Sequence, residues 1–198
     1  MGNLTDHFSG GGGNNILEQL YFTPDGRTIT TLQGDITAPN VTAYQVVAST
    51  SPVAFANCNF SYTPPTGTTK VLLEFTFYGR SNNSGNLYPL PTVYARLDNT
   101  VITDSKWGGY FYTAGASYDT FDPTIKAEIL INGTDDIANN SVSTWTSSKT
   151  FSFIGMSYDT NQHSWLMHNV RYGSPTSGTA SNSTNYQCPP KYKVTAYK

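Results

Sequence analysis

Alternation of apolar and polar side chains in the segment 70–78 constrains the fold of this chain more than any other feature. The apolar face of that segment is formed by Val71, Leu73, Phe75 and Phe77. A period of two is that of a β-strand, whose successive side chains point to opposite faces. The segment 124–131 repeats the pattern, with an apolar face formed by Ile125, Ala127, Ile129 and Ile131. The alternation predicts two strands, each with one buried face.

The rest of the chain reads as shorter strands separated by proline, glycine, asparagine and aspartate. The other strand candidates are 28–32, 41–49, 53–62, 92–97, 100–103, 107–113, 149–158, 164–172 and 192–197. The best helix candidate is the short segment 16–22, and no window longer than about six residues has the apolar spacing of a helix. Strands without crossover helices exclude a parallel βαβ architecture. The pattern predicts an all-β fold, an antiparallel β-sandwich of jelly-roll type.

The beginning of the chain has a different character. Four consecutive glycines occupy positions 10–13, and such a run does not hold a helix or strand because glycine loses much backbone entropy on ordering. A phosphate-binding loop would need a preceding strand and a following lysine, which are missing here. We therefore expect a flexible docking arm over residues 1–20 and one sandwich domain over residues 21–198. The arm's contact residues would be Leu4, Phe8, Gly10, Gly11, Gly12 and Gly13.

The composition argues against two classes of partner, nucleic acids and membranes. Charged residues make up 12% of the 198 residues, aromatic residues 14%, and the net charge is −2. Nucleic-acid binding relies on lysine and arginine, so we expect no nucleic-acid partner. No apolar run is long enough for a membrane span. The beginning of the chain also lacks the features of a signal peptide, which predicts synthesis in a cytosol.

Catalytic residues are not evident, and we expect neither an enzyme nor a cofactor. The carboxylates of Asp119, Asp122, Asp135 and Asp136 lie at turn signals. Paired carboxylates serve glycoside hydrolysis, but aspartate is also an ordinary turn residue. His163 and His168 are placed on opposite faces of a predicted strand, and the histidines do not have zinc-site spacing.

The cysteines Cys58 and Cys188 leave two alternatives open. They are either free thiols or a disulfide, which would close a long loop and stabilise the fold. A nucleophilic Cys58 would need a histidine that only the fold brings near.

The aromatic segment 107–112 is the best candidate for a recognition surface, through Trp107, Tyr110 and Tyr112. Tyrosine and tryptophan give large, rigid contacts at interfaces. The alternative is that these rings belong to the core of the sandwich.

Three stretches resemble small structural proteins of aquatic phages and large algal viruses: residues 1–13 (MGNLTDHFSGGGG), 25–27 (DGR) and 61–68 (SYTPPTGT). The resemblance covers the arm and roughly the first eighty residues. It implies a virion component, such as a capsid fibre, a decoration protein or a tail-fibre-like knob. No functional residue carries over from these motifs.

The expected function is therefore that of a structural protein on the virion surface, anchored through its arm to capsid or tail proteins. Viral fibres suggest a homotrimer by analogy alone. One alternative is a host-attachment module of a tail fibre that binds a surface glycan. Another is a hydrolase on a jelly-roll scaffold, which needs two carboxylates in one cleft.

Overall fold

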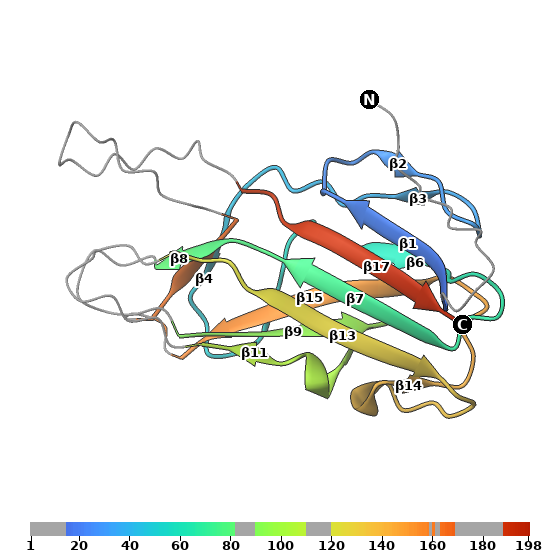
Figure 1. Ribbon diagram of the computed structural model, residues 1–198. Coiled ribbons are helices and arrows are strands. Elements are labelled where there is room, and N and C mark those ends of the chain that lie inside the picture. Colours follow the sequence, from blue (N-terminus) through green and yellow to red (C-terminus); the bar gives the residue numbers. More distant parts are fainter. Residues whose placement is uncertain (1–14, 82–89, 110–119, 159, 161–162, 169–187) are drawn as a thin grey trace.

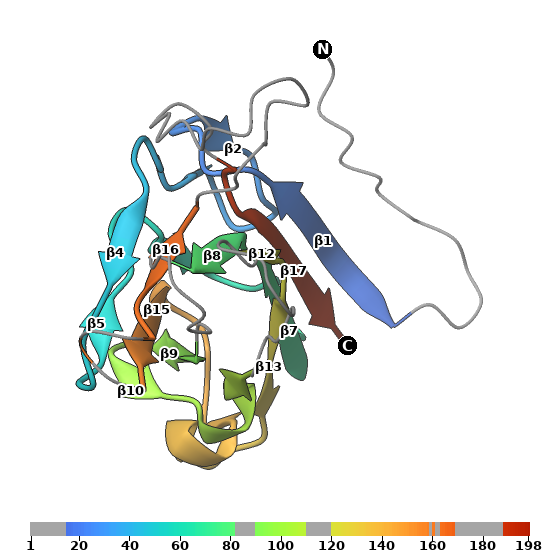
Figure 2. The same cartoon turned by 90° about the vertical axis from the view of Figure 1, so that its left-hand side faces the viewer.

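Two β-sheets pack face to face in the computed structural model of the chain, which describes residues 15–81, 90–109, 120–158, 160, 163–168 and 188–198 (Figure 1). The first sheet has the spatial order β1 (Ile16–Phe22), β17 (Lys191–Tyr197), β7 (Lys70–Thr76), β13 (Thr124–Ile131) and β14 (Ser141–Val142). The second sheet has the order β10 (Thr100–Val101), β9 (Pro91–Leu97), β15 (Lys149–Ser157) and β5 (Val53–Ala54). In the second sheet β11 (Trp107–Gly108) also pairs with β9, and β6 (Phe60–Tyr62) also pairs with β15. Figure 2 shows the two layers side by side.

The strand pairs are nested along the chain. β1 pairs with β17, β6 with β15 and β7 with β13, and the β9–β10 hairpin lies innermost; all these pairs are antiparallel. Successive pairs alternate between the first sheet and the second. A nested hairpin folded in this way is a jelly roll. The predicted fold class is confirmed.

Smaller elements extend this sandwich. A third sheet has the order β12 (Thr120–Phe121), β8 (Gly79–Ser81), β16 (Trp165–Met167) and β4 (Gln45–Val47). A separate pair joins β2 (Thr28–Ile29) to β3 (Ile36–Thr37), and two short 3-10 helices are η1 (Thr103–Ser105) and η2 (Ile137–Asn139). In the part of the chain that the structure describes, no helix has the length and apolar character needed to span a membrane.

Aromatic rings join the two sheets. Phe75 on β7 of the first sheet and Phe153 on β15 of the second stack with ring centroids 3.8 Å apart. Within the first sheet, Phe22 on β1 stacks on its neighbour Tyr192 of β17 at 5.0 Å. All four rings are buried. Aromatic residues bury large apolar areas, which are the main favourable term in folding.

Strand β1 corrects two expectations. The segment 16–22 is a strand and not a helix, and Leu20 and Phe22 are buried in the core. Residues 16–20 therefore belong to the sandwich and not to the arm predicted over residues 1–20. Residues 1–14, with the predicted contacts Leu4, Phe8 and Gly10 to Gly13, lie outside the described part of the chain.

The start of β1 and the end of β17 lie together. The Lys198 N–H donates a hydrogen bond to the Asn15 carbonyl at 2.6 Å, because β1 and β17 are antiparallel neighbours. Figure 1 shows this end of the sandwich on the right, with β4, β8 and β11 toward the opposite end.

Candidate functional site

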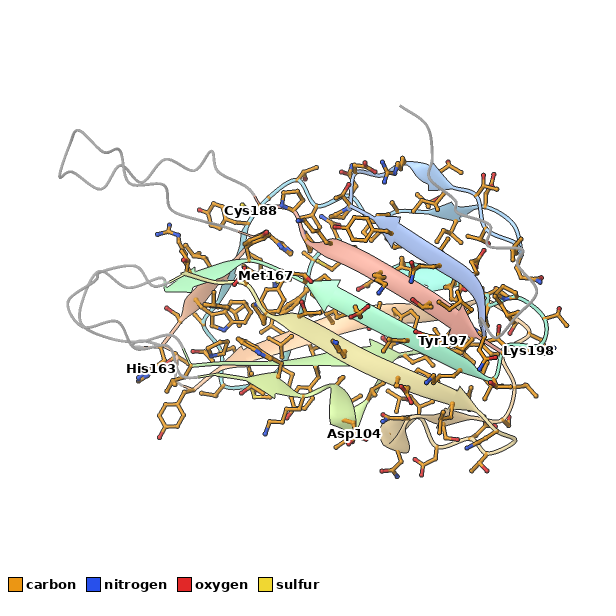
Figure 3. All side chains as sticks on the ribbon, in the orientation of Figure 1. Asp104, His163, Met167, Cys188, Tyr197 and Lys198 are labelled. Carbon is orange, nitrogen blue, oxygen red and sulfur yellow. The ribbon has the colours of Figure 1, made fainter. Side chains whose placement is uncertain are left out.

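A groove of about 720 Å³ opens where β9, β11 and β15 meet. Its walls include Thr50, Thr92, Lys106, Gly108, Ser157 and Tyr158. We call it the loop-end groove, because it lies at the end of the sandwich away from Lys198. His163, whose ring contacts Tyr158, marks this end in Figure 3.

Strand periodicity decides which side chains of β11 reach the groove. Trp107 turns inward, where its ring stacks on Phe121 at 5.8 Å and meets the edge of Phe77 at 6.0 Å. Its neighbours Lys106 and Gly108 consequently line the groove. Trp107 is one of the three predicted recognition residues. It packs against the core, as the alternative interpretation of the aromatic segment had it. Tyr110 and Tyr112 lie outside the described residues.

Tyr158 is the aromatic ring that the groove presents to solvent. Its side chain is 71% exposed, and its ring meets that of His163 edge to face at 5.4 Å. The preceding Ser157 is buried, and its Oγ donates to the His163 carbonyl at 2.5 Å. The His163 backbone is thus bound to the end of β15, where its ring lies beside that of Tyr158.

Lys106 supplies the charge of the groove. Buried Ser105 fixes the backbone beside it, because Ser105 Oγ accepts from the Ala95 N–H at 2.8 Å and donates to the Ile102 carbonyl at 2.6 Å. Four other lysines are paired with carboxylates: Lys70 with Glu128, Lys126 and Lys193 with Glu74, and Lys149 with Asp98. The Lys106 ammonium has no such partner among the described residues, and no described carboxylate lines the groove.

Sequence reasoning missed both Lys106 and Tyr158. The signal for Tyr158 was present in β15, where Phe151, Phe153 and Gly155 share the core face. The same alternation continued past Ser157 places Tyr158 on the outer face. Lys106 had no comparable signal. The turn η1 precedes it, so no strand alternation leads up to it that would show which face its side chain occupies.

The fold brings a histidine to Cys58. Cys58 Sγ lies 3.3 Å from His168 Nε2, and both side chains are buried. Burial raises the pKa of the Cys58 thiol to about 12 and lowers the pKa of His168 to about 4. At neutral pH the two groups are therefore a neutral thiol and a neutral imidazole, without the thiolate that a nucleophile needs.

The other cysteine lies close to the same histidine. The Cys188 N–H donates to the His168 carbonyl at 3.1 Å. Both Cys58 and Cys188 are free thiols in the structure. Of the two alternatives left open by the sequence, the structure therefore has the free thiols and not the disulfide.

The aspartates proposed as a carboxylate pair hold turns. Asp135 accepts the Ser143 N–H at 2.7 Å and the Ser143 hydroxyl at 2.8 Å, and these hydrogen bonds lower its pKa. Asp136 accepts the Asn139 side-chain amide at 2.7 Å at the start of η2. Asp122 is exposed, and Asp119 lies outside the described residues. Within the described ranges, no group of three His, Cys, Asp or Glu residues is placed to hold a metal ion.

Comparisons with known proteins give little further information. No family model matches the chain, and no curated protein matches it. Among solved structures, a family 35 carbohydrate binding module from Clostridium thermocellum is similar to this chain at 7% sequence identity and a TM-score of 0.21, covering 90% of this chain and 98% of that chain. A TM-score this low supports no argument about site or function.

Proposed function

We propose that this chain is a structural protein displayed on the surface of a virus particle and anchored through the residues that precede β1. The observation that supports display is that the ends of the first and last strands and the loop-end groove lie at opposite ends of the sandwich. β1 starts and β17 ends at one end of the sandwich (Figure 1). The loop-end groove lies toward the other end, which His163 marks in Figure 3. Attachment at the first end would leave the groove facing outward. The assignment to a virion depends on the sequence resemblance of residues 1–13, 25–27 and 61–68.

Deletion of residues 1–14 tests the anchor. Asn15 is kept because its carbonyl accepts the Lys198 N–H. We expect a soluble body with an unchanged melting temperature that no longer co-sediments with particles. The matched variant Leu4→Asp/Phe8→Asp keeps the length and the glycines, and it should lose incorporation as well if the apolar side chains bind. Incorporation of the truncated protein at the wild-type level would contradict the proposal.

A homotrimer is part of the same proposal. Ordering a flexible arm on binding costs entropy, and several arms in one oligomer raise the effective concentration of the second and third contacts. Light scattering on the purified chain should give three times the monomer mass. A monomer at micromolar concentration would remove this part of the proposal and leave the anchor test unaffected.

A second candidate function is glycan binding, and the exposed ring of Tyr158 favours it. The C–H face of a sugar ring packs on an aromatic face, while hydroxyl groups bind the sugar's edge. A glycan array with the wild type and Tyr158→Ala tests this candidate. Tyr21→Ala is the matched control, because Tyr21 is 63% exposed on β1 of the other sheet. We expect binding to be lost with Tyr158→Ala and kept with Tyr21→Ala; equal loss or no binding at all would contradict it.

A further inference from the structure

Three features of the loop-end groove identify the class of sugar that fits it. The first is the Lys106 ammonium, the charged group of the described lining. The nearest acidic residue in the sequence, Asp104, is bound elsewhere, because its Oδ2 accepts the Asn140 side-chain amide at 2.7 Å. Figure 3 shows Asp104 at the edge of the sandwich beside the η2 turn. The lysine charge is therefore not neutralised from its own turn.

The second feature is a set of free hydroxyl groups. Thr50 and Thr92 both line the groove, and neither hydroxyl has a hydrogen-bond partner within the described part of the chain. Hydroxyl groups of this kind both donate and accept hydrogen bonds. They match the alternating donors and acceptors on the edge of a saccharide.

The third feature is the bare backbone at Gly108. A Cβ at this position would lie 3.6 Å from both Thr92 Oγ1 and the Pro91 carbonyl oxygen. These are ordinary contacts, so packing does not require glycine here. A side chain would nevertheless stand over the Thr92 hydroxyl, and glycine leaves that hydroxyl accessible from the groove.

We infer that the loop-end groove binds an anionic saccharide, with the sugar ring on Tyr158 and its carboxylate or sulfate group on Lys106. This inference deepens the proposed glycan-binding function and rests on it. A charge-assisted hydrogen bond is about twice as strong as a neutral one. Lys106 is then the residue that distinguishes acidic sugars from neutral ones, and Tyr158 binds both.

Calorimetry with matched oligosaccharides tests the inference on the full chain. The probes are tetragalacturonate, its methyl ester, which has the same backbone without charge, and a sulfated galactan tetrasaccharide. We expect the acid to bind about tenfold more tightly than the ester, with an affinity that falls as salt rises. Tighter binding of the sulfated probe than of the uronate would identify sulfate as the preferred anionic group of the sugar. That result would equally support an anionic-saccharide site.

Variants separate the charge from the rest of the groove. Lys106→Met keeps the length of the side chain, and it should reduce binding of the acid to the level of the ester while leaving the ester unchanged. Lys191→Met is the matched control, since Lys191 is exposed on β17 without an ion pair among the described residues. Gly108→Val should weaken every probe without lowering the melting temperature.

The outcomes separate failure of the anionic-saccharide inference from failure of glycan binding as a whole. Equal binding of acid and ester, or an unchanged Lys106→Met variant, overturns the inference and leaves glycan binding intact. Binding of none of the probes, together with a blank glycan array, overturns both.

Discussion

Tyr62 donates its hydroxyl hydrogen to the buried carboxylate of Glu18, with an oxygen–oxygen distance of 2.7 Å. The other carboxylate oxygen of Glu18 accepts the Leu32 N–H at 2.6 Å. Glu18 thus joins β1 to β6 of the second sheet and to the loop between β2 and β3. A buried carboxylate is tolerated only when donors surround it, so this contact ties the first strand to the sandwich.

Tyr62→Phe should destabilise the protein by about 1–3 kcal/mol, because it leaves a buried acceptor without its donor. The measurement is urea unfolding followed by tryptophan fluorescence. Tyr21→Phe is the control, since it removes a hydroxyl from an exposed ring. Equal midpoints for the wild type and Tyr62→Phe would contradict a structural role for the hydrogen bond.

Glu18 also explains why β1 was mistaken for a helix candidate. The inward positions of β1 are Glu18, Leu20 and Phe22, and a glutamate at the first of them breaks the apolar alternation. Its partner Tyr62 lies 44 residues away, so no local pattern shows that the glutamate is satisfied inside. β13, by contrast, has a clean alternation, and its predicted bounds 124–131 match the structure. The strand candidates 92–97 and 100–103 correspond to β9 and β10, which pair as a hairpin around Asp98 and Asn99. Both of these residues adopt the positive φ that such a turn needs.

Gly155→Ala should destabilise the protein by about 1–3 kcal/mol through overpacking. A Cβ on Gly155 would lie 2.5 Å from Phe55 Cε1 and 3.0 Å from Trp165 Cζ2, both in the core. The control is Gly108→Ala, whose Cβ would meet nothing closer than 3.6 Å. Thermal unfolding should show a lower melting temperature for the first variant and not for the second; a stable Gly155→Ala would mean that the two rings move apart without cost.

The candidate site was predictable only in part. The sequence indicated an aromatic segment near residue 107, and the groove does lie there. Trp107 itself points inward, where its ring contacts Phe77 and Phe121. Phe77 lies in the connection between β7 and β8, and Phe121 lies on β12. Which of two faces an aromatic strand buries depends on the sheet packed against it, and that partner is set by the topology. The groove residues come from β9, β11 and β15, from positions next to these strands, and from Thr50 in the connection between β4 and β5. No sequence spacing reveals that these segments meet.

The two thiols should differ in reactivity toward a disulfide reagent. Cys58 is fully buried, with a pKa raised to about 12, whereas Cys188 is half-buried, and burial raises its pKa as well. The native protein should therefore release one equivalent of reporter slowly, and the second only in guanidinium, since the thiolate is the reacting form. Cys188→Ser should abolish the native reaction. Absence of reaction in guanidinium without reductant would instead indicate a disulfide.

Acid should weaken the fold through His168. Burial lowers its pKa to about 4, whereas an unfolded histidine has a pKa of about 6.5. As the pH falls below the unfolded value, the unfolded state binds the proton first. The free energy of unfolding should fall by about 3 kcal/mol between these two pKa values. The cost arises because a charged ring would be buried against the neutral Cys58 thiol, and Nδ1 has no hydrogen-bond partner among the described residues.

The variant His168→Asn isolates this contribution. His168 has a positive φ of 61°, a conformation that asparagine adopts readily, and asparagine does not titrate. Urea unfolding at a series of pH values should show a smaller loss of stability for the variant than for the wild type between pH 6.5 and 4. Parallel pH profiles would mean that His168 binds its proton at the same pH in the folded and unfolded states. The folded protein would then hold a charged ring below pH 6.5, which would contradict the buried neutral imidazole.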